Sequence, residues 1–143
     1  MEWRQMGETY TVRLERGDEV IGSLTEWAKG RGITAASMVG IGALEQVELG
    51  YYELPTRTYH RHTFPEDYEL LNLTGNVSLL EDGETFVHAH VTIGGSDYST
   101  KGGHLFSALV AVTVEVVVTP LPGQIRRAFD EACGLKLWTL AAE

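Results

Sequence analysis

The chain has 143 residues, of which 43% are hydrophobic, and this is enough for one domain with its own core. Twenty acidic residues against eleven basic ones give a net charge of −9, which repels a polyanion unless the basic residues cluster, and they do not. The sequence has neither an N-terminal apolar region nor an apolar run of about eighteen residues, so we expect a cytoplasmic protein with a single domain over residues 1–143. The single cysteine, Cys133, suits a reducing compartment, and we expect a buried, inert thiol.

The first part of the chain predicts a strand followed by the one convincing helix. Residues 10–15 alternate apolar and polar side chains, which is typical of a half-buried strand. Asp18 is a candidate N-cap for the helix, and Gly30 or Gly32 would end it. The apolar residues expected on one face of this helix, where they would pack on a sheet, are Val20, Ile21, Leu24, Trp27 and Ala28.

Extended character then continues to the C-terminus. Residues 33–39 and 43–53 read as strands, and a loop containing Pro55 and Pro65 follows. Residues 71–79 and 85–93 alternate apolar and polar side chains around a turn at residues 81–84, which predicts an antiparallel hairpin. The most apolar strand, expected to be central, covers residues 109–119, and residues 134–140 form a last short strand.

Two histidines lie on the second strand of the predicted hairpin, in the sequence Val87-His88-Ala89-His90-Val91. Side chains of a strand alternate between its two faces, so His88 and His90 share one face, about 6.6 Å apart. Their neighbours Val87, Ala89 and Val91 form the apolar face, so the histidines point away from the core. Alone, such a pair is better explained as two exposed or interface histidines than as metal ligands.

His104 strengthens the case for a metal site. It follows Gly102-Gly103, at the end of a glycine-rich segment that can turn back and bring it beside the histidine strand. Three imidazoles with a fourth position open to water or a ligand match the arrangement of open zinc sites. We therefore predict that His88, His90 and His104 bind zinc or another divalent transition metal.

Other candidate motifs are weaker. A second pair, His60 and His62, is expected in a charged, solvated loop. The segment Gly40-Ile41-Gly42 resembles a dinucleotide fingerprint, but no helix is predicted after it, so tight strand packing explains it better. Glu115 interrupts the central apolar strand, where it could orient a ligating histidine, act as a general base, or pair with a basic residue.

An ordered set of motifs resembles the PPC domain, the domain conserved in plants and prokaryotes. The resemblance spans about residues 9–140. No single motif is specific to this family, but the order of the motifs along the chain is. The motifs are Gly17-Asp18-Glu19-Val20, Gly30-Arg31-Gly32-Ile33, Gly40-Ile41-Gly42-Ala43, Tyr68-Glu69-Leu70-Leu71-Asn72-Leu73-Thr74-Gly75, His88-Ala89-His90-Val91 and Gly102-Gly103-His104-Leu105.

This resemblance implies an α+β fold in which one main helix packs on a mostly antiparallel sheet of about seven strands, and it implies assembly as a homotrimer. Plant members carry AT-hook motifs and bind DNA in the nucleus. Prokaryotic members stand alone and are often described as DNA-binding by that association, while some are similar to metal-binding proteins that use the histidines matching His88, His90 and His104.

The sequence departs from the plant pattern where that pattern contacts DNA. An AT-hook needs a short Arg-Gly-Arg-Pro-like core to enter the minor groove, and Gly30-Arg31-Gly32-Ile33 lacks the second arginine and the proline. Together with the net charge of −9, this makes direct nucleic-acid binding a poor expectation.

Three functions remain open. The first is a homotrimeric zinc-binding module with its site near a subunit boundary and a small anionic or carbonyl ligand at the metal. The second is a regulatory or protein-interaction module that reaches DNA only through a partner. The third is a zinc-dependent hydrolase or lyase, in which Glu69 or Glu115 would have to supply the base.

Overall fold

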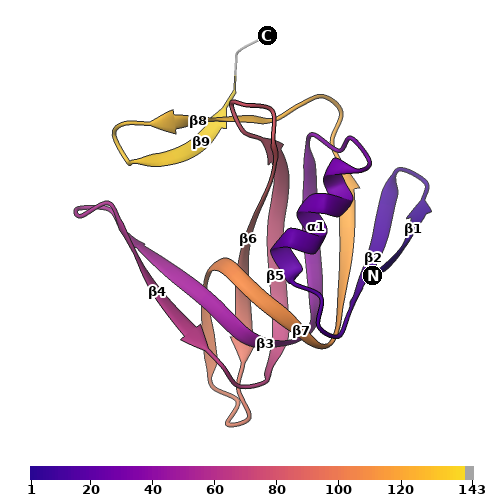
Figure 1. Ribbon diagram of the computed structural model, residues 1–143, viewed down its shortest axis with the longest axis vertical. Coiled ribbons are helices and arrows are strands. Elements are labelled where there is room, and N and C mark those ends of the chain that lie inside the picture. Colours follow the sequence, from indigo (N-terminus) through magenta and orange to yellow (C-terminus); the bar gives the residue numbers. More distant parts are fainter. Residues whose placement is uncertain (141–143) are drawn as a thin grey trace.

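The computed structural model describes residues 1–140, which form nine strands and one helix (Figure 1). The strands are β1 (Glu2–Met6), β2 (Thr9–Glu15), β3 (Ala36–Glu53), β4 (Thr58–Phe64), β5 (Tyr68–Leu79), β6 (Thr85–Gly94), β7 (Thr100–Pro120), β8 (Arg126–Asp130) and β9 (Leu135–Thr139). The helix α1 covers Val20–Lys29. The α+β class and the single main helix agree with the sequence prediction, whereas the number of strands exceeds the expected seven.

Two long strands organise the sheet. β3 has 18 residues and β7 has 21, and they pair with each other in antiparallel register. Both β3 and β6 also pair with β5, and β6 returns to pair with β7, so β3, β5, β6 and β7 close a ring of neighbours. The prediction that residues 109–119 lie centrally is confirmed, because β7 contacts β2, β3 and β6. The sheet is mixed, since one bridge between β5 and β8 is parallel.

The core lies between α1 and the sheet and inside this ring of strands. Helix α1 packs against β6 and β7 and buries Val20, Leu24, Trp27 and Ala28. Its N-cap is Glu19, whose carboxylate accepts hydrogen bonds from the amides of Ile21 and Gly22. The prediction that Asp18 caps the helix is wrong, because its carboxylate instead accepts a hydrogen bond from the backbone amide of Glu15. At ten residues α1 is far shorter than a membrane-crossing helix, and the described residues contain no other helix.

Three further expectations are corrected. The two strands expected at residues 33–39 and 43–53 are one strand, β3, with a register shift between Gly40 and Gly42. A Cβ atom at Gly40 would lie 2.9 Å from the carbonyl oxygen of Glu115, which explains the glycine by close strand packing. The loop predicted between Pro55 and Pro65 contains β4, although His60 and His62 are exposed as expected. Cys133 is half-buried at the turn between β8 and β9 rather than fully buried.

The hairpins β3–β4 and β8–β9 extend from the body of the molecule on the same side (Figure 1). Their tips are joined by two hydrogen bonds. The Tyr52 hydroxyl donates to the carbonyl oxygen of Cys133 over 2.6 Å, and the Arg57 guanidinium donates to that of Ala132 over 3.2 Å. The two hairpins therefore frame the face of β6 that carries the histidines.

Core packing inside the ring of strands gives a direct stability test. Leu44 in β3 has no exposed surface, so Leu44→Ala removes buried methyl groups and leaves a cavity. We expect a loss of about 2–5 kcal/mol in the free energy of unfolding, measured by chemical denaturation. Leu54, just beyond the end of β3, is 57% exposed. Leu54→Ala should therefore change the free energy of unfolding by less than about 0.5 kcal/mol. Equal losses in the two variants would contradict the described core.

Candidate metal centre

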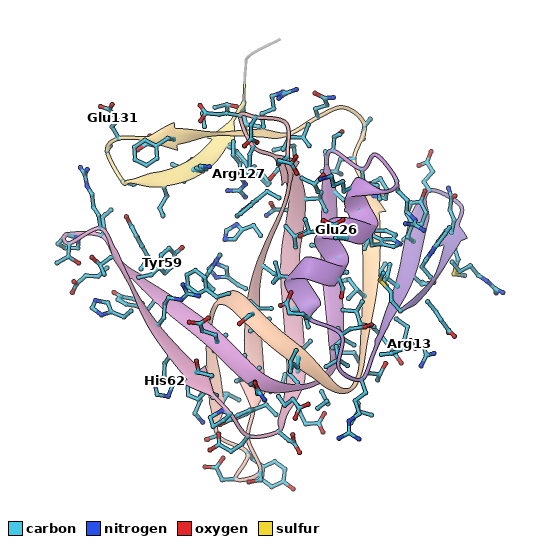
Figure 2. All side chains as sticks on the ribbon, viewed as in Figure 1. Arg13, Glu26, Tyr59, His62, Arg127 and Glu131 are labelled. Atoms are coloured by element: carbon cyan, nitrogen blue, oxygen red, sulfur yellow. The ribbon has the colours of Figure 1, made fainter. Side chains whose placement is uncertain are left out.

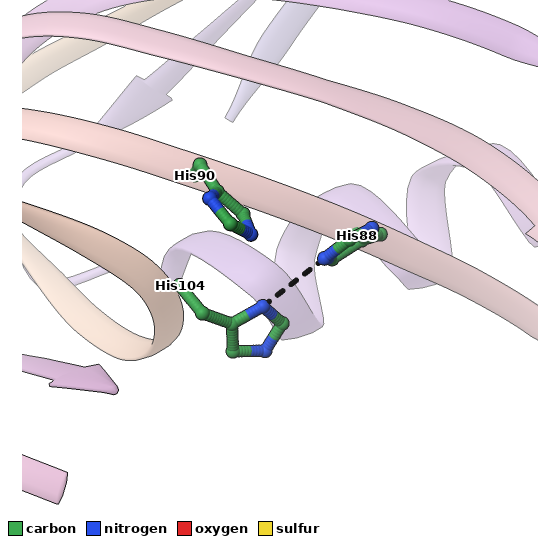
Figure 3. A group of neighbouring side chains, drawn as sticks. All are labelled: His88, His90 and His104. Atoms are coloured by element: carbon green, nitrogen blue, oxygen red, sulfur yellow. Dashed lines mark hydrogen bonds between the residues drawn. The ribbon is translucent and has the colours of Figure 1, made fainter. Parts of the chain in front are cut away.

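Three imidazoles converge on one point beside β6 and β7 (Figure 3). His88 and His90 extend from β6, and His104 extends from β7, where it pairs directly with His90 in the antiparallel register. One ring nitrogen from each residue lies within 4.8 Å of the others. The structure thus brings together the three side chains singled out in the sequence.

The strand pattern and the glycine at position 103 explain this convergence. Val87, Ala89 and Val91 are buried on the opposite face of β6, so His88 and His90 share the outer face as predicted. The segment that returns the chain is shorter than expected, because β7 already begins at Thr100 and His104 lies within it. A Cβ atom at Gly103 would come within 2.9 Å of the carbonyl oxygen of Gly50, so a side chain there would push β7 away from β3.

Aromatic rings cover His104. The ring of Tyr59, from β4, lies 5.3 Å from the His104 ring, and Phe106 lies 4.7 Å from it in an edge-on arrangement. Burial, followed by the positive charges of His90, Arg61 and Arg127, lowers the pKa of His104 to about 4. His104 is therefore neutral at pH 7, which is the protonation state that binds a metal.

His88 is held by Arg127 from β8. The Arg127 Nη2 atom lies 3.2 Å from the His88 Nδ1 atom, and a guanidinium has no acceptor, so the Nδ1 atom accepts this hydrogen bond. In the neutral ring the proton is then on Nε2, which lies 3.1 Å from the Nδ1 atom of His104 and donates to it. Burial and the Arg127 charge lower the pKa of His88 to about 4.

The donor set fits a transition metal. Neutral imidazole nitrogens are common zinc ligands, and at pH 7 protons compete weakly for His88 and His104. Among residues 1–140 no carboxylate or thiol joins the three histidines within the same distance. A metal bound here would keep at least one coordination position for water or another ligand.

The two candidate bases lie elsewhere in the structure. Glu69 on β5 pairs with Gly94 and lines a surface hollow with Tyr98, while Glu115 on β7 lines a different hollow. Both side chains are exposed, and neither belongs to the histidine cluster. The second histidine pair is also separate, since His60 contacts Glu53 over 3.3 Å.

Sequence reasoning missed Tyr59 and Arg127. Both reach the site from strands that were not predicted, and Arg127 contacts His88 across 39 positions of the chain. The adjacent Arg126 is exposed, so nothing in the local sequence separates the buried arginine from its neighbour. Only the alternation of buried and exposed side chains along β8 distinguishes Arg127 from Arg126, and a strand of five residues is too short to show that alternation in the sequence.

Comparisons with known proteins agree with this fold. The family model of the Plants and Prokaryotes Conserved (PCC) domain matches residues 1–122. A search of curated proteins finds no match.

Solved structures match over nearly the whole chain. A metal-containing protein of Archaeoglobus fulgidus is 39% identical, with a TM-score of 0.87 over 95% of this chain and 96% of that chain. A plant- and prokaryote-conserved (PPC) protein of Pyrococcus horikoshii is 34% identical, with a TM-score of 0.86 over 97% and 96%. A "putative dna binding protein" of Bacteroides thetaiotaomicron is 33% identical, with a TM-score of 0.93 over 96% of each chain. The chain therefore belongs to the Plants and Prokaryotes Conserved domain family.

Proposed function

We propose that this protein is a homotrimeric metal-binding module that holds zinc through His88, His90 and His104 and presents it to a small molecule. The observation that carries the proposal is the convergence of three imidazole nitrogens within 4.8 Å. The Archaeoglobus fulgidus relative, described as metal-containing, supports it. Another divalent transition metal with affinity for imidazole would use the same ligands.

The open coordination position favours ligand binding over a purely structural role. Structural zinc sites are usually closed by four protein ligands, and here three are available. Zinc at such a site polarises a bound carbonyl or lowers the pKa of a bound water to about 7. Hydrolysis or a lyase reaction on a small molecule is therefore the second candidate, for which a base would have to come from the ligand or from a residue outside the cluster.

The homotrimer is supported by an apolar face of the sheet. Six large apolar side chains there are between 42% and 59% exposed and line one hollow. They are Trp3, Met6, Val39, Ile41, Leu71 and Val117. Contiguous apolar surface of this kind marks interaction sites. Further copies of this chain are the occupants that we propose for it.

The alternative is a regulatory module associated with DNA, as the description of the Bacteroides relative suggests. The charges weigh against direct contact. The net charge is −9, and the exposed side chains of Arg13, Lys29 and Arg61 each pair with a carboxylate. Fewer cations are then free to replace the counterions of a phosphate backbone. In this alternative, DNA would be reached through a protein partner.

Metal content tests the proposal. We expect about one equivalent of zinc per chain in untagged protein, measured by elemental analysis, and loss of that zinc in the His88→Ala/His104→Ala variant. The His60→Ala/His62→Ala variant is the matched control, because that exposed pair is outside the cluster. Well under one equivalent in the wild type, or full retention in the first variant, would refute the metal site.

The pH dependence of stability follows from the lowered pKa of both histidines. In metal-free protein the pKa of His88 and of His104 is about 4, against about 6.5 in an unfolded chain. Between these values the unfolded state binds more protons, so the free energy of unfolding falls as the pH falls from about 6.5 to about 4. In His104→Gln this decrease should be smaller, as measured by denaturation at pH 7 and pH 4.5. Identical decreases would contradict the buried, neutral state of His104.

Oligomeric state tests the apolar face. Light scattering should give three times the 15.8 kDa protomer mass. Ile41→Asp places a charge on that face and should shift the mass toward the protomer. Leu54→Asp alters a residue of similar exposure away from the hollow and should leave the trimer intact. A wild-type mass near that of one protomer would rule out the trimer.

A further inference from the structure

Arg127 is a buried cation without an acidic partner. Its exposed fraction is 6%, which makes it the only charged residue among the buried side chains of residues 1–140. In the described part of the chain no carboxylate oxygen lies within ion-pair distance of its guanidinium. Burying a charge is costly unless an opposite charge or strong hydrogen bonds compensate it.

Neutral acceptors hold the guanidinium in place. Nε donates to the Ser78 hydroxyl over 2.8 Å, and Nη1 donates to the carbonyl oxygen of Lys136 over 2.9 Å. Nη2 donates to the Asn76 side-chain oxygen over 3.1 Å and to the His88 Nδ1 atom over 3.2 Å. These contacts fix the orientation of the guanidinium but leave its charge uncompensated.

Metal binding through His88 would remove one of these acceptors. If the Nε2 atom of His88 is a metal ligand, the proton of the neutral ring moves to Nδ1. That Nδ1–H would then face the Nη2–H of Arg127. Two donors cannot form a hydrogen bond, so the contact of 3.2 Å between Nη2 and Nδ1 would lose its acceptor. An N–H of the guanidinium then lacks its acceptor beside the His88 ring, and only an added acceptor can satisfy it.

Aromatic side chains surround this released donor. The guanidinium carbon lies 5.2 Å from the centre of the Phe86 ring and 5.9 Å from that of Trp138. The ring of Tyr59 lies 5.3 Å from that of His104, on the β3–β4 hairpin across from the β8–β9 hairpin that carries Arg127 (Figure 2). These surroundings suit a small organic molecule with one charged group.

We propose that Arg127 binds the carboxylate of a small organic acid whose neighbouring hydroxyl or carbonyl oxygen occupies the open position of the metal held by His88, His90 and His104. The inference rests on the proposed metal site. A carboxylate oxygen can accept a charge-assisted hydrogen bond from the released N–H, and it supplies the single negative charge that Arg127 lacks.

Lactate and its neutral isostere lactamide test this ligand class. Calorimetric titration of zinc-loaded protein should show saturable lactate binding. Lactamide should bind at least about tenfold more weakly, because it lacks the negative charge that pairs with the guanidinium. Arg127→Gln should weaken lactate binding at least about tenfold while the zinc content stays at one equivalent. Arg126→Gln, which alters the exposed neighbour, should change lactate affinity less than about twofold.

Each contrary result has its own meaning. Equal lactate affinity in wild type and Arg127→Gln, equal binding of lactate and lactamide, or tighter binding of inorganic phosphate than of lactate would overturn the carboxylate site while leaving the metal site intact. Absence of zinc from the wild type would overturn both proposals. If Arg127→Gln does not fold, the Nε–H resonance of Arg127 in zinc-loaded wild type decides the question. We expect lactate, but not lactamide, to shift it, and an unchanged resonance at saturating lactate would refute the proposal.

Discussion

The antiparallel pairing of β6 with β7 is the constraint on which the site depends. It places His90 directly opposite His104, and the two-residue alternation of β6 adds His88 on the same face. The pairing in turn depends on the close approach of β7 to β3, which the glycine at position 103 permits. The three imidazoles are therefore positioned by backbone hydrogen bonds of a sheet rather than by a loop, and such positioning is well suited to a site that must keep its geometry.

The surroundings of the histidines set their chemistry. One hairpin brings Tyr59 against His104, and another brings Arg127 against His88, so both rings are partly removed from water. Desolvation and nearby positive charge act in the same direction and lower the pKa of both rings. An acidic protein thus contains a small site that is locally cationic, and that contrast favours an anionic small ligand over a nucleic acid.

The sequence predicted the parts of this arrangement that depend on local pattern. Alternation placed His88 and His90 away from the core, and the glycines before His104 indicated the return of the chain. The helix cap was missed because Asp18 and Glu19 are both able to accept amide hydrogens, and the contact of Asp18 with Glu15 decides between them. No local pattern selects between two such carboxylates.

Contacts between distant segments account for the remaining errors. The short strand β4 has mostly exposed residues, so it lacks the apolar alternation by which strands are recognised. Arg127 lies beside an exposed arginine, and its role arises only when β8 is placed beside the end of β5. The histidine ligands could thus be predicted, while the groups that tune them could not.

X-ray absorption at the zinc edge reports the atoms bound to the metal. If His88, His90 and His104 hold zinc, the spectrum of purified protein is fitted by about three imidazole nitrogens at about 2.0–2.1 Å, with oxygen completing the coordination. A first shell that contains sulfur, or one made of oxygen without imidazole, would contradict a zinc site built from His88, His90 and His104.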